Sequence, residues 1–257
     1  MAGSFIKKIA YSVLNLLNGN KGIRRTINRF TIRFPAEWSR FYEHNYEKEN
    51  YEFLRRIVKP GMHIVDVGAH LGLFSVACSQ LAGPSAKIVS FEPTPGTYSV
   101  LTKTLELNHC DNVTPVQGAI SDKEGEAVFY VSTIGGCNSN SLVKNKIESK
   151  LNEHTVTLFT IDQVVEKYSL TPGLLKIDAE GAELDVLKGG RNTLQKFKPI
   201  LILGLHPTFI NQKGDTLEGI WDRLSEAGYE IRENEKTLIK SDFCGRQLLF
   251  DVHCIPQ

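Results

Sequence analysis

One stretch decides the fold of this chain: Val65-Asp66-Val67-Gly68-Ala69-His70-Leu71-Gly72. It follows a short apolar run that begins at His63 and precedes a helix-like segment over residues 73–81, so we predict a strand, a tight turn and a helix. Gly68 and Gly72 let the backbone pass close to a ligand, because neither carries a Cβ. The dinucleotide pattern G-x-G-x-x-G is absent, and the carboxylate of Asp66 at the strand end favours a cationic or amino-acid-like ligand over a pyrophosphate.

The composition is that of an ordinary globular protein. The chain has 257 residues, of which 41% are hydrophobic and 23% are charged, and this suits one large α/β domain or a domain with an extension. The formal net charge of +1 provides no general attraction for nucleic acid, so we expect no nucleic-acid partner. No run of about 18 apolar residues occurs, and no transmembrane helix is predicted.

The cysteines predict a reducing compartment. None of the five belongs to a C-x-x-C pair, and an odd, scattered set is typical of free thiols rather than of a disulfide framework. We therefore expect a cytoplasmic protein. We also predict no metal site, because no H-x-x-x-H or paired-aspartate spacing indicates one.

The first 33 residues differ from the rest of the chain. Apolar residues at helical spacing come first, basic residues follow, and no acidic residue occurs before Glu37, so we predict a basic amphipathic helix. Such a helix either docks on the core with its basic face in solvent, or touches a partner or an anionic membrane, at whose periphery the protein would then lie. The apolar residues are Ile6, Ile9, Val13, Leu16 and Leu17, and the basic ones are Lys21, Arg24, Arg25, Arg29 and Arg33.

Strand-like segments alternate with helix-like segments along the rest of the chain, which predicts a mostly parallel sheet with helices on both faces. The last three strands follow one another closely, so we expect them to be antiparallel. Ligands bind such sheets outside the carboxyl ends of the strands, where Asp66, Glu92, Asp178 and His206 are predicted to lie. The predicted strands cover residues 63–67, 87–91, 113–120, 126–131, 156–159, 174–177, 200–205, 229–232, 237–240 and 248–255.

Several motifs together resemble one enzyme family. The turn after Asp66, followed about twenty residues later by Phe91-Glu92-Pro93, is similar to the S-adenosylmethionine site of class I methyltransferases. The run Leu175-Lys176-Ile177-Asp178-Ala179-Glu180-Gly181-Ala182-Glu183 resembles the hallmark of the FkbM family within that class. Residues 119–125, residues 157–162 and the pair His206-Pro207 also match, so the likeness spans roughly residues 45–210.

The resemblance implies a fold, a cofactor and a reaction. The fold is α/β and Rossmann-like, with a mostly parallel seven-stranded sheet, an antiparallel C-terminal edge and helices on both faces. Residues 46–257 would form this methyltransferase domain, and residues 1–45 an N-terminal helical extension. A methyl group would pass from S-adenosylmethionine to a hydroxyl of a small molecule or glycan, such as a sugar or a secondary metabolite. By position, the cofactor would contact Asp66, Gly68, His70, Gly72, Glu92, Pro93, Gly118, Ala119 and Asp178, with both ribose hydroxyls on Glu92.

Four residues carry the predicted chemistry. His206 is expected to remove the proton of the acceptor hydroxyl, because an unperturbed imidazole titrates near neutrality. Asp178 is expected to hold the acceptor or the ammonium group of the cofactor, with Glu180 as a neighbour. Lys176 is either a catalytic neighbour or a strand lysine paired with an acid. Glu183 is expected to stabilise the start of its helix through the macrodipole.

One loop and two departures from the family pattern leave alternatives open. Residues 132–145 are either an acceptor lid or an ordinary surface loop. His70 stands where the family usually has Asn, and Gly204 stands where it usually has Glu, which removes a carboxylate beside His206. The alternatives are a non-catalytic scaffold that keeps the cofactor pocket, and a methyltransferase acting on nitrogen or nucleic acid. The absence of G-x-G-x-x-G argues against a nicotinamide dehydrogenase, and the absence of an Asn/Asp-Pro-Pro-Tyr motif argues against base methylation.

Overall fold

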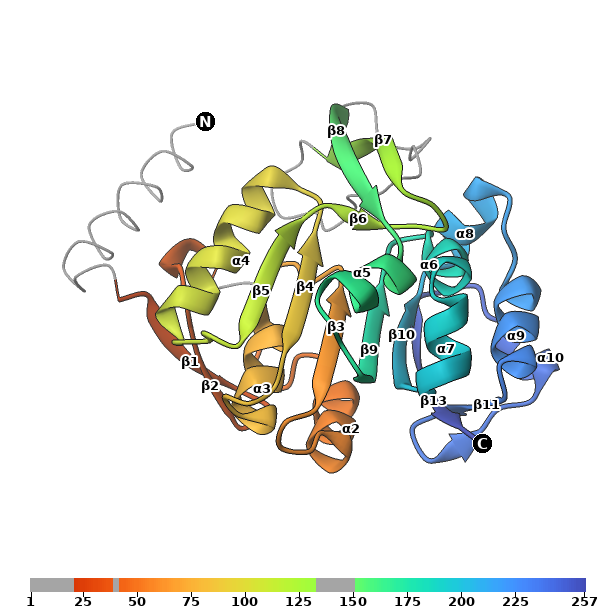
Figure 1. The fold of residues 1–257 in the computed structure, drawn as a ribbon, viewed down its shortest axis with the longest axis horizontal. Coiled ribbons are helices and arrows are strands. Elements are labelled where there is room, and N and C mark those ends of the chain that lie inside the picture. Colours follow the sequence, from red (N-terminus) through yellow and green to blue (C-terminus); the bar gives the residue numbers. More distant parts are fainter. Residues whose placement is uncertain (1–20, 39–41, 133–150) are drawn as a thin grey trace.

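The computed structural model describes residues 21–38, 42–132 and 151–257. An eight-stranded sheet crosses the described molecule in the order β12-β11-β13-β10-β9-β3-β4-β5 (Figure 1). The strands from β10 to β5 are parallel, and β13, β11 and β12 pair antiparallel, which confirms the predicted architecture. The strands are β3 His63–Val67, β4 Ile88–Glu92, β5 Val113–Gln117, β9 Pro172–Asp178, β10 Ile200–Leu205, β11 Tyr229–Glu233, β12 Lys236–Thr237 and β13 Phe250–Pro256. The two-residue β12 begins one residue before the strand predicted over residues 237–240 and ends inside it.

The sheet is buried on both faces, and most residues of its central strands are apolar. In β3, Ile64 belongs to one apolar core, whereas Val65 and Val67 belong to the other. Successive side chains of a strand point to opposite faces, so a strand buried on both sides reads as a continuous β-branched run. Helices α2 Lys48–Ile57, α3 Leu73–Ala82 and α4 Pro95–Leu107 contribute to the first core; α5 Ile161–Lys167, α6 Glu183–Gly189, α7 Arg191–Phe197 and α9 Leu217–Glu226 contribute to the second.

The described part of the N-terminal extension is a β-hairpin, so the helix predicted through residue 33 is wrong there. Strands β1 Ile23–Ile27 and β2 Phe30–Phe34 pair antiparallel. Asn28 and Arg29 between them have φ of 46° and 71°, and two successive residues with positive φ are typical of the type I′ turn. The apolar residues of β2 alternate with polar ones, which is a strand period. The predicted stripe from Ile6 to Leu17 lies outside the described residues.

A small second sheet stands at the carboxyl ends of the main strands (Figure 1). It contains β6 Ala119–Ile120, β8 Leu151–Phe159 and β7 Gly125–Ser132, in that order. The single strand predicted over residues 113–120 is therefore wrong, because the chain leaves β5 at Gly118 and joins the second sheet. A Cβ at Gly118 would lie 2.6 Å from the ring of Phe159, so only glycine fits this crossing.

The C-terminal third contains helices that the sequence did not predict. These are α7, α8 Pro207–Lys213 and α10 Lys240–Cys244. Of the strand predicted over residues 237–240, only Thr237 lies in a strand, and α10 begins at Lys240. Thr160 caps α5, because its Oγ1 accepts from the N–H of Gln163, and Thr216 caps α9 in the same way by accepting from the N–H of Gly219. Among the described residues, no helix combines the length and apolar character needed to cross a bilayer.

Candidate active site

A cavity of about 450 Å³ opens at the carboxyl ends of β3, β4, β9 and β10, and this volume is typical of small-molecule sites. It gathers polar strand-end residues that the sequence predicted to lie together, namely Glu92, Asp178 and His206. Asp66 and Gly72 lie behind its wall. The predicted site residues that line it are Gly68, His70, Glu92, Pro93, Gly118, Ala119, Lys176, Asp178, Glu180 and His206.

The turn after β3 requires glycine for a steric reason. Gly68 has a φ of 73°, and a Cβ there would lie 2.0 Å from the backbone oxygen of Asp178. The backbone N–H groups of Gly68 and Ala69 both donate to the carbonyl of Phe91, at 3.0 and 2.8 Å. The backbone of the turn itself therefore forms the cavity wall between β3 and β9. Gly72, with a φ of 82°, is the residue at which α3 begins.

Lys176 supports this turn through a hydrogen bond to its backbone. Its Nζ donates to the carbonyl of Gly68 at 2.7 Å and lies 3.4 Å from Asp178 Oδ2 and 3.6 Å from Asp66 Oδ1. Burial acts to lower the pKa of Lys176, but the charges of the neighbouring carboxylates outweigh it and the pKa is raised. Asp66 is fully buried and also accepts from Ser75 at 2.6 Å. Lys176 is therefore a strand lysine paired with acids, and it also lines the cavity.

Glu92 presents a buried carboxylate to the cavity from the end of β4. Its Oε2 accepts from the N–H of His70 at 3.1 Å, and its Oε1 accepts from the N–H of Thr94 at 2.9 Å. Burial raises the pKa of Glu92 to about 7, although both backbone donors act to lower it. An ionised carboxylate has about four lone-pair sites. The side chain of Thr94 also donates to Glu92, and the carboxylate as a whole keeps acceptor capacity for a ligand hydroxyl.

His70 fits its turn through its backbone and its ring. Its φ of 50° is left-handed, a conformation in which Asn and His are several-fold enriched among non-glycine residues, so His in place of Asn is accommodated. Its Nδ1 lies 2.9 Å from the hydroxyl of Tyr42, and its ring meets Trp38 edge-on. Burial lowers the pKa of His70 to about 4, and Lys176 contributes in the same direction. The imidazole of His70 is therefore neutral near pH 7.

His206 begins α8 beside the cavity, and its ring is held by two carboxylates. Nδ1 lies 2.9 Å from Glu183 Oε1, and Nε2 lies 3.6 Å from Asp178 Oδ1. A carboxylate can only accept, so Nδ1 carries the proton and the lone pair of Nε2 is directed away from Glu183. Burial acts to lower the pKa of His206, but the hydrogen bond with Glu183 and the charge of Asp178 outweigh it, so the pKa is raised.

Glu183 does more than the macrodipole role predicted for it. It lies in the first turn of α6, as expected, but its fully buried Oε1 also accepts from the N–H of Gly181 at 3.0 Å and binds His206. Glu180, three residues before it in the chain, is a half-buried cavity residue with a φ of 45°. Desolvation raises the pKa of Glu180, and the charges of Asp178 and Glu92 add to the effect.

The family of the chain follows from a match to the whole motif set. The model of the methyltransferase FkbM domain matches residues 66–231, more than half of the chain. The chain belongs to the FkbM methyltransferase family. This membership confirms the resemblance drawn from the sequence, and the sheet and its covering helices form the class I, Rossmann-like fold that it implied.

Methyltransferases from several organisms are similar to this FkbM methyltransferase. The hexuronic acid methyltransferase AglP of Haloferax volcanii is 28% identical over 175 residues, which are 68% of this chain and 69% of that protein. Methyltransferase sdnD of Sordaria araneosa is 32% identical over 157 residues, 49% of this chain and 59% of the relative. A solved structure, methyltransferase FkbM from Methylobacillus flagellatus KT, is 14% identical with a TM-score of 0.46, covering 79% of this chain and 50% of that one.

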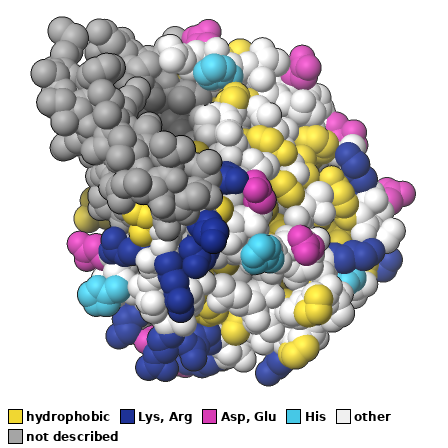
Figure 2. Space-filling view, turned by 90° about the vertical axis from the view of Figure 1, so that its left-hand side faces the viewer, with side chains coloured by type: hydrophobic (Ala, Val, Ile, Leu, Met, Phe, Trp, Pro, Cys, Tyr) yellow, Lys and Arg dark blue, Asp and Glu magenta, His cyan; other side chains and the backbone are white. Residues whose placement is uncertain are grey.

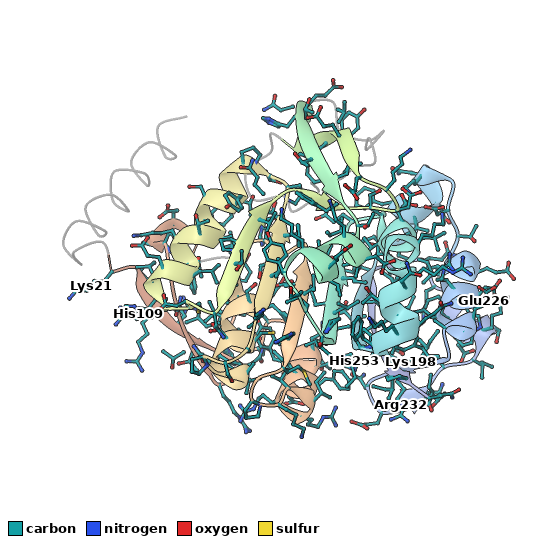
Figure 3. All side chains as sticks on the ribbon, viewed as in Figure 1. Lys21, His109, Lys198, Glu226, Arg232 and His253 are labelled. Carbon is teal, nitrogen blue, oxygen red and sulfur yellow. The ribbon has the colours of Figure 1, made fainter. Side chains whose placement is uncertain are left out.

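This FkbM methyltransferase has cavity carboxylates that sequence reasoning missed, and Asp251 is one of them. Asp251 of β13 pairs with Gly204 of β10, and a Cβ at Gly204 would lie 3.3 Å from both Asp251 Oδ1 and Asp178 Oδ1. Gly204 therefore leaves the room into which Asp251 points. Asn50 donates to Asp251 Oδ2 at 2.9 Å and is itself held by His253, which Figure 3 labels. Burial raises the pKa of Asp251 to about 6.

Other cavity residues come from the segment before β3. Glu47, at the start of α2, and the aromatic residues Tyr42 and Tyr46 line the wall opposite β10. The sequence showed an aromatic and acidic segment there, but its packing on the site depends on tertiary contacts. The predicted lid, residues 132–145, lies outside the described residues except for residue 132. Within the described ranges, no group of three His, Cys, Asp or Glu side chains is arranged to hold a metal ion.

Proposed function

We propose that this FkbM methyltransferase transfers a methyl group from S-adenosylmethionine to a hydroxyl oxygen of a sugar, a glycan or a secondary metabolite. One observation carries the choice of oxygen: the imidazole of His206 borders the cavity with its Nδ1 bound to Glu183 and its Nε2 close to Asp178. A hydroxyl, unlike an amine, must lose its proton to a base as it becomes methylated. A neutral imidazole in this orientation is such a base.

The cavity residues fit the proposed cofactor. The carboxylate of Glu92 borders the cavity and suits the two hydroxyls of a ribose, because its two oxygens match a vicinal diol. The turn at Gly68 lets the methionine part lie against bare backbone. Gly118 and Ala119 border the adenine end of the cavity, and Asp178 is the carboxylate for the ammonium group. When bound, the cofactor supplies an electrophilic methyl group on a sulfonium.

The residues of this chain then perform positioning and one proton transfer. The acceptor hydroxyl would lie between Asp178 and His206. As its oxygen bonds to the methyl carbon, the bond from that carbon to the sulfonium sulfur would break to leave S-adenosylhomocysteine, and the hydroxyl proton would pass to Nε2 of His206. Glu183 stabilises the imidazolium that forms, because its carboxylate accepts from Nδ1. A base in hydrogen-bond reach contributes about 10²–10⁴-fold to such rates. Lys176 keeps its proton and holds the turn, so it takes no part in this transfer.

Asp251 extends the acceptor side of the cavity. Its carboxylate takes the room that Gly204 leaves and so replaces, from the neighbouring strand, the acid that the family pattern has on β10. Carboxylates accept from the hydroxyls of a sugar, and the relative named as a hexuronic acid methyltransferase supports a sugar as acceptor. A non-catalytic scaffold is the competing function, and it does not require the His206–Glu183 pair.

Isotope transfer tests the proposed function. Wild-type protein with methyl-labelled S-adenosylmethionine should label at least one member of a panel of sugar nucleotides and polyols. His206→Ala should lower turnover at least 100-fold, the lower part of the range for a general base, while calorimetry finds cofactor binding unchanged. Glu92→Ala should lose the binding itself. Turnover at the wild-type rate in His206→Ala would disprove the base assignment, and wild-type cofactor binding without any labelled product would favour the scaffold.

A further inference from the structure

The β1–β2 hairpin carries a concentration of positive charge that the proposed active site does not use. Five basic side chains and no acidic one occur between residues 21 and 33, although the whole chain has a net charge of only +1. The remainder of the chain is therefore net acidic. Figure 2 shows Lys and Arg side chains gathered at the lower left of one face of the molecule. Charge of one sign gathered in this way is typical of a docking surface for a polyanion.

The hairpin holds these side chains in a fixed position relative to the core. Its inner face is apolar and buried, with Ile27, Ile32 and Phe34 fully enclosed against α3, α4 and their neighbours. Asn108, at the end of α4, accepts from the N–H of Arg33 at 2.9 Å and donates to the carbonyl of Arg33 at 2.6 Å. The position of the outer face relative to the core is therefore determined by packing and by hydrogen bonds.

The outer face presents arginines side by side. Arg24 lies directly opposite Arg33 across the two strands, and Arg29 projects from the exposed turn. Like charges in directly opposed positions destabilise a strand pair. The arrangement is therefore unfavourable for the hairpin alone, and an anionic surface would relieve it.

The arginines of this outer face also differ from the ion-paired arginines of the chain. In the structure as described, no carboxylate lies within ion-pair distance of Arg24, Arg29 or Arg33. By contrast, Arg232 lies 2.5 Å from Glu230 at the other end of the sheet. Figure 3 labels Arg232 at the lower right and Lys21, next to the hairpin, at the far left. Three arginines without an acidic partner therefore share this one hairpin.

We propose that the outer face of the β1–β2 hairpin docks on the anionic headgroups of a lipid bilayer. Guanidinium groups match phosphate geometry, and a short row of them on a flat face suits a plane of headgroups. Proteins that bind single-stranded nucleic acid add exposed aromatic side chains for stacking, whereas Phe30 and Phe34 of this hairpin are buried. The proposal is independent of the reaction proposed above.

Vesicle cosedimentation of the full chain tests the proposal. Each Lys or Arg near an anionic bilayer contributes about fivefold in affinity. The triple variant Arg24→Thr, Arg29→Asn, Arg33→Thr should therefore bind phosphatidylglycerol-containing phosphatidylcholine vesicles on the order of 100-fold more weakly than wild type. Thr suits the strand positions, and Asn tolerates the left-handed conformation of residue 29. Wild-type binding should fall with added salt and be absent on pure phosphatidylcholine.

The matched control removes three arginines from the other end of the molecule: Arg223→Gln, Arg232→Thr and Arg246→Gln. It has the same net charge as the triple variant and should bind vesicles as wild type does. The single variant Arg29→Asn, at the exposed turn, should bind vesicles about fivefold more weakly than wild type. This single variant is used in the test if the triple variant is unstable. Equal binding by wild type and Arg29→Asn, equal binding to neutral vesicles, or tighter binding to a single-stranded RNA oligonucleotide than to vesicles would each overturn the proposal.

Discussion

Replacing Glu183 by Gln isolates the effect of one charge on His206. The amide oxygen of Gln can keep both hydrogen bonds that Oε1 makes, from Gly181 at 3.0 Å and from His206 at 2.9 Å. A hydrogen bond to a charged group contributes about 1.5–3 kcal/mol, and a neutral one about 0.5–1.5 kcal/mol. The difference of about 1–1.5 kcal/mol corresponds to about one pKa unit. Because Glu183 raises the pKa of His206, the variant should lower that pKa by about one unit.

Proton NMR of the imidazole ring is the direct assay, because it needs no acceptor. In wild-type protein saturated with S-adenosylhomocysteine, His206 should titrate above its ordinary value of 6.5. A base acts only when neutral, so kcat/KM should rise with pH through this pKa. In Glu183→Gln, both the NMR midpoint and the acid limb of kcat/KM should move about one unit to lower pH.

The control is Glu226→Gln on α9, a residue that Figure 3 labels far from the cavity. This variant should leave the titration of His206 unchanged. The signal of His206 is assigned by its loss in His206→Ala. A midpoint in Glu183→Gln that is equal to or higher than that of wild type would refute the reasoning, because the raised pKa would then not depend on the Glu183 carboxylate.

Two cavity carboxylates lead to further predictions. Burial raises the pKa of Glu92 to about 7. Only the ionised form accepts both ribose hydroxyls. Calorimetry should therefore find about tenfold weaker S-adenosylmethionine binding near pH 6 than near pH 8. Glu92→Gln should bind weakly at both values, and a wild-type affinity independent of pH would contradict this role. Asp251→Asn should raise KM for the acceptor about 5–30-fold, the loss of one charge-assisted hydrogen bond. The folded-state pKa of Asp251 is raised to about 6, so ionisation of Asp251 destabilises the fold as pH rises. The melting temperature of Asp251→Asn should therefore exceed that of wild type by more near pH 8 than near pH 4. An unchanged KM would remove Asp251 from the acceptor side.

Local patterns predicted most of the sheet because each central strand is buried on both faces. The continuous apolar run of β3 and the acid that ends β4 are visible in a few consecutive residues. The same local reasoning failed at the hairpin, where basic residues at near-helical spacing were assigned to a helix. The buried alternation in β2 and the turn at Asn28 decided otherwise. It also failed at Gly118, where the chain changes from one sheet to the other.

The sequence by itself determined the family, the parallel sheet and the strand-end residues Glu92, Asp178 and His206. It could do so because these features follow from residue order along single strands and turns. Only the tertiary structure decided that Lys176 supports the turn, that Glu183 holds His206, and that Asp251 takes the room left by Gly204. These contacts join segments far apart in the chain. Their geometry depends on strand register and on which side chains share a cavity, and no local pattern encodes either.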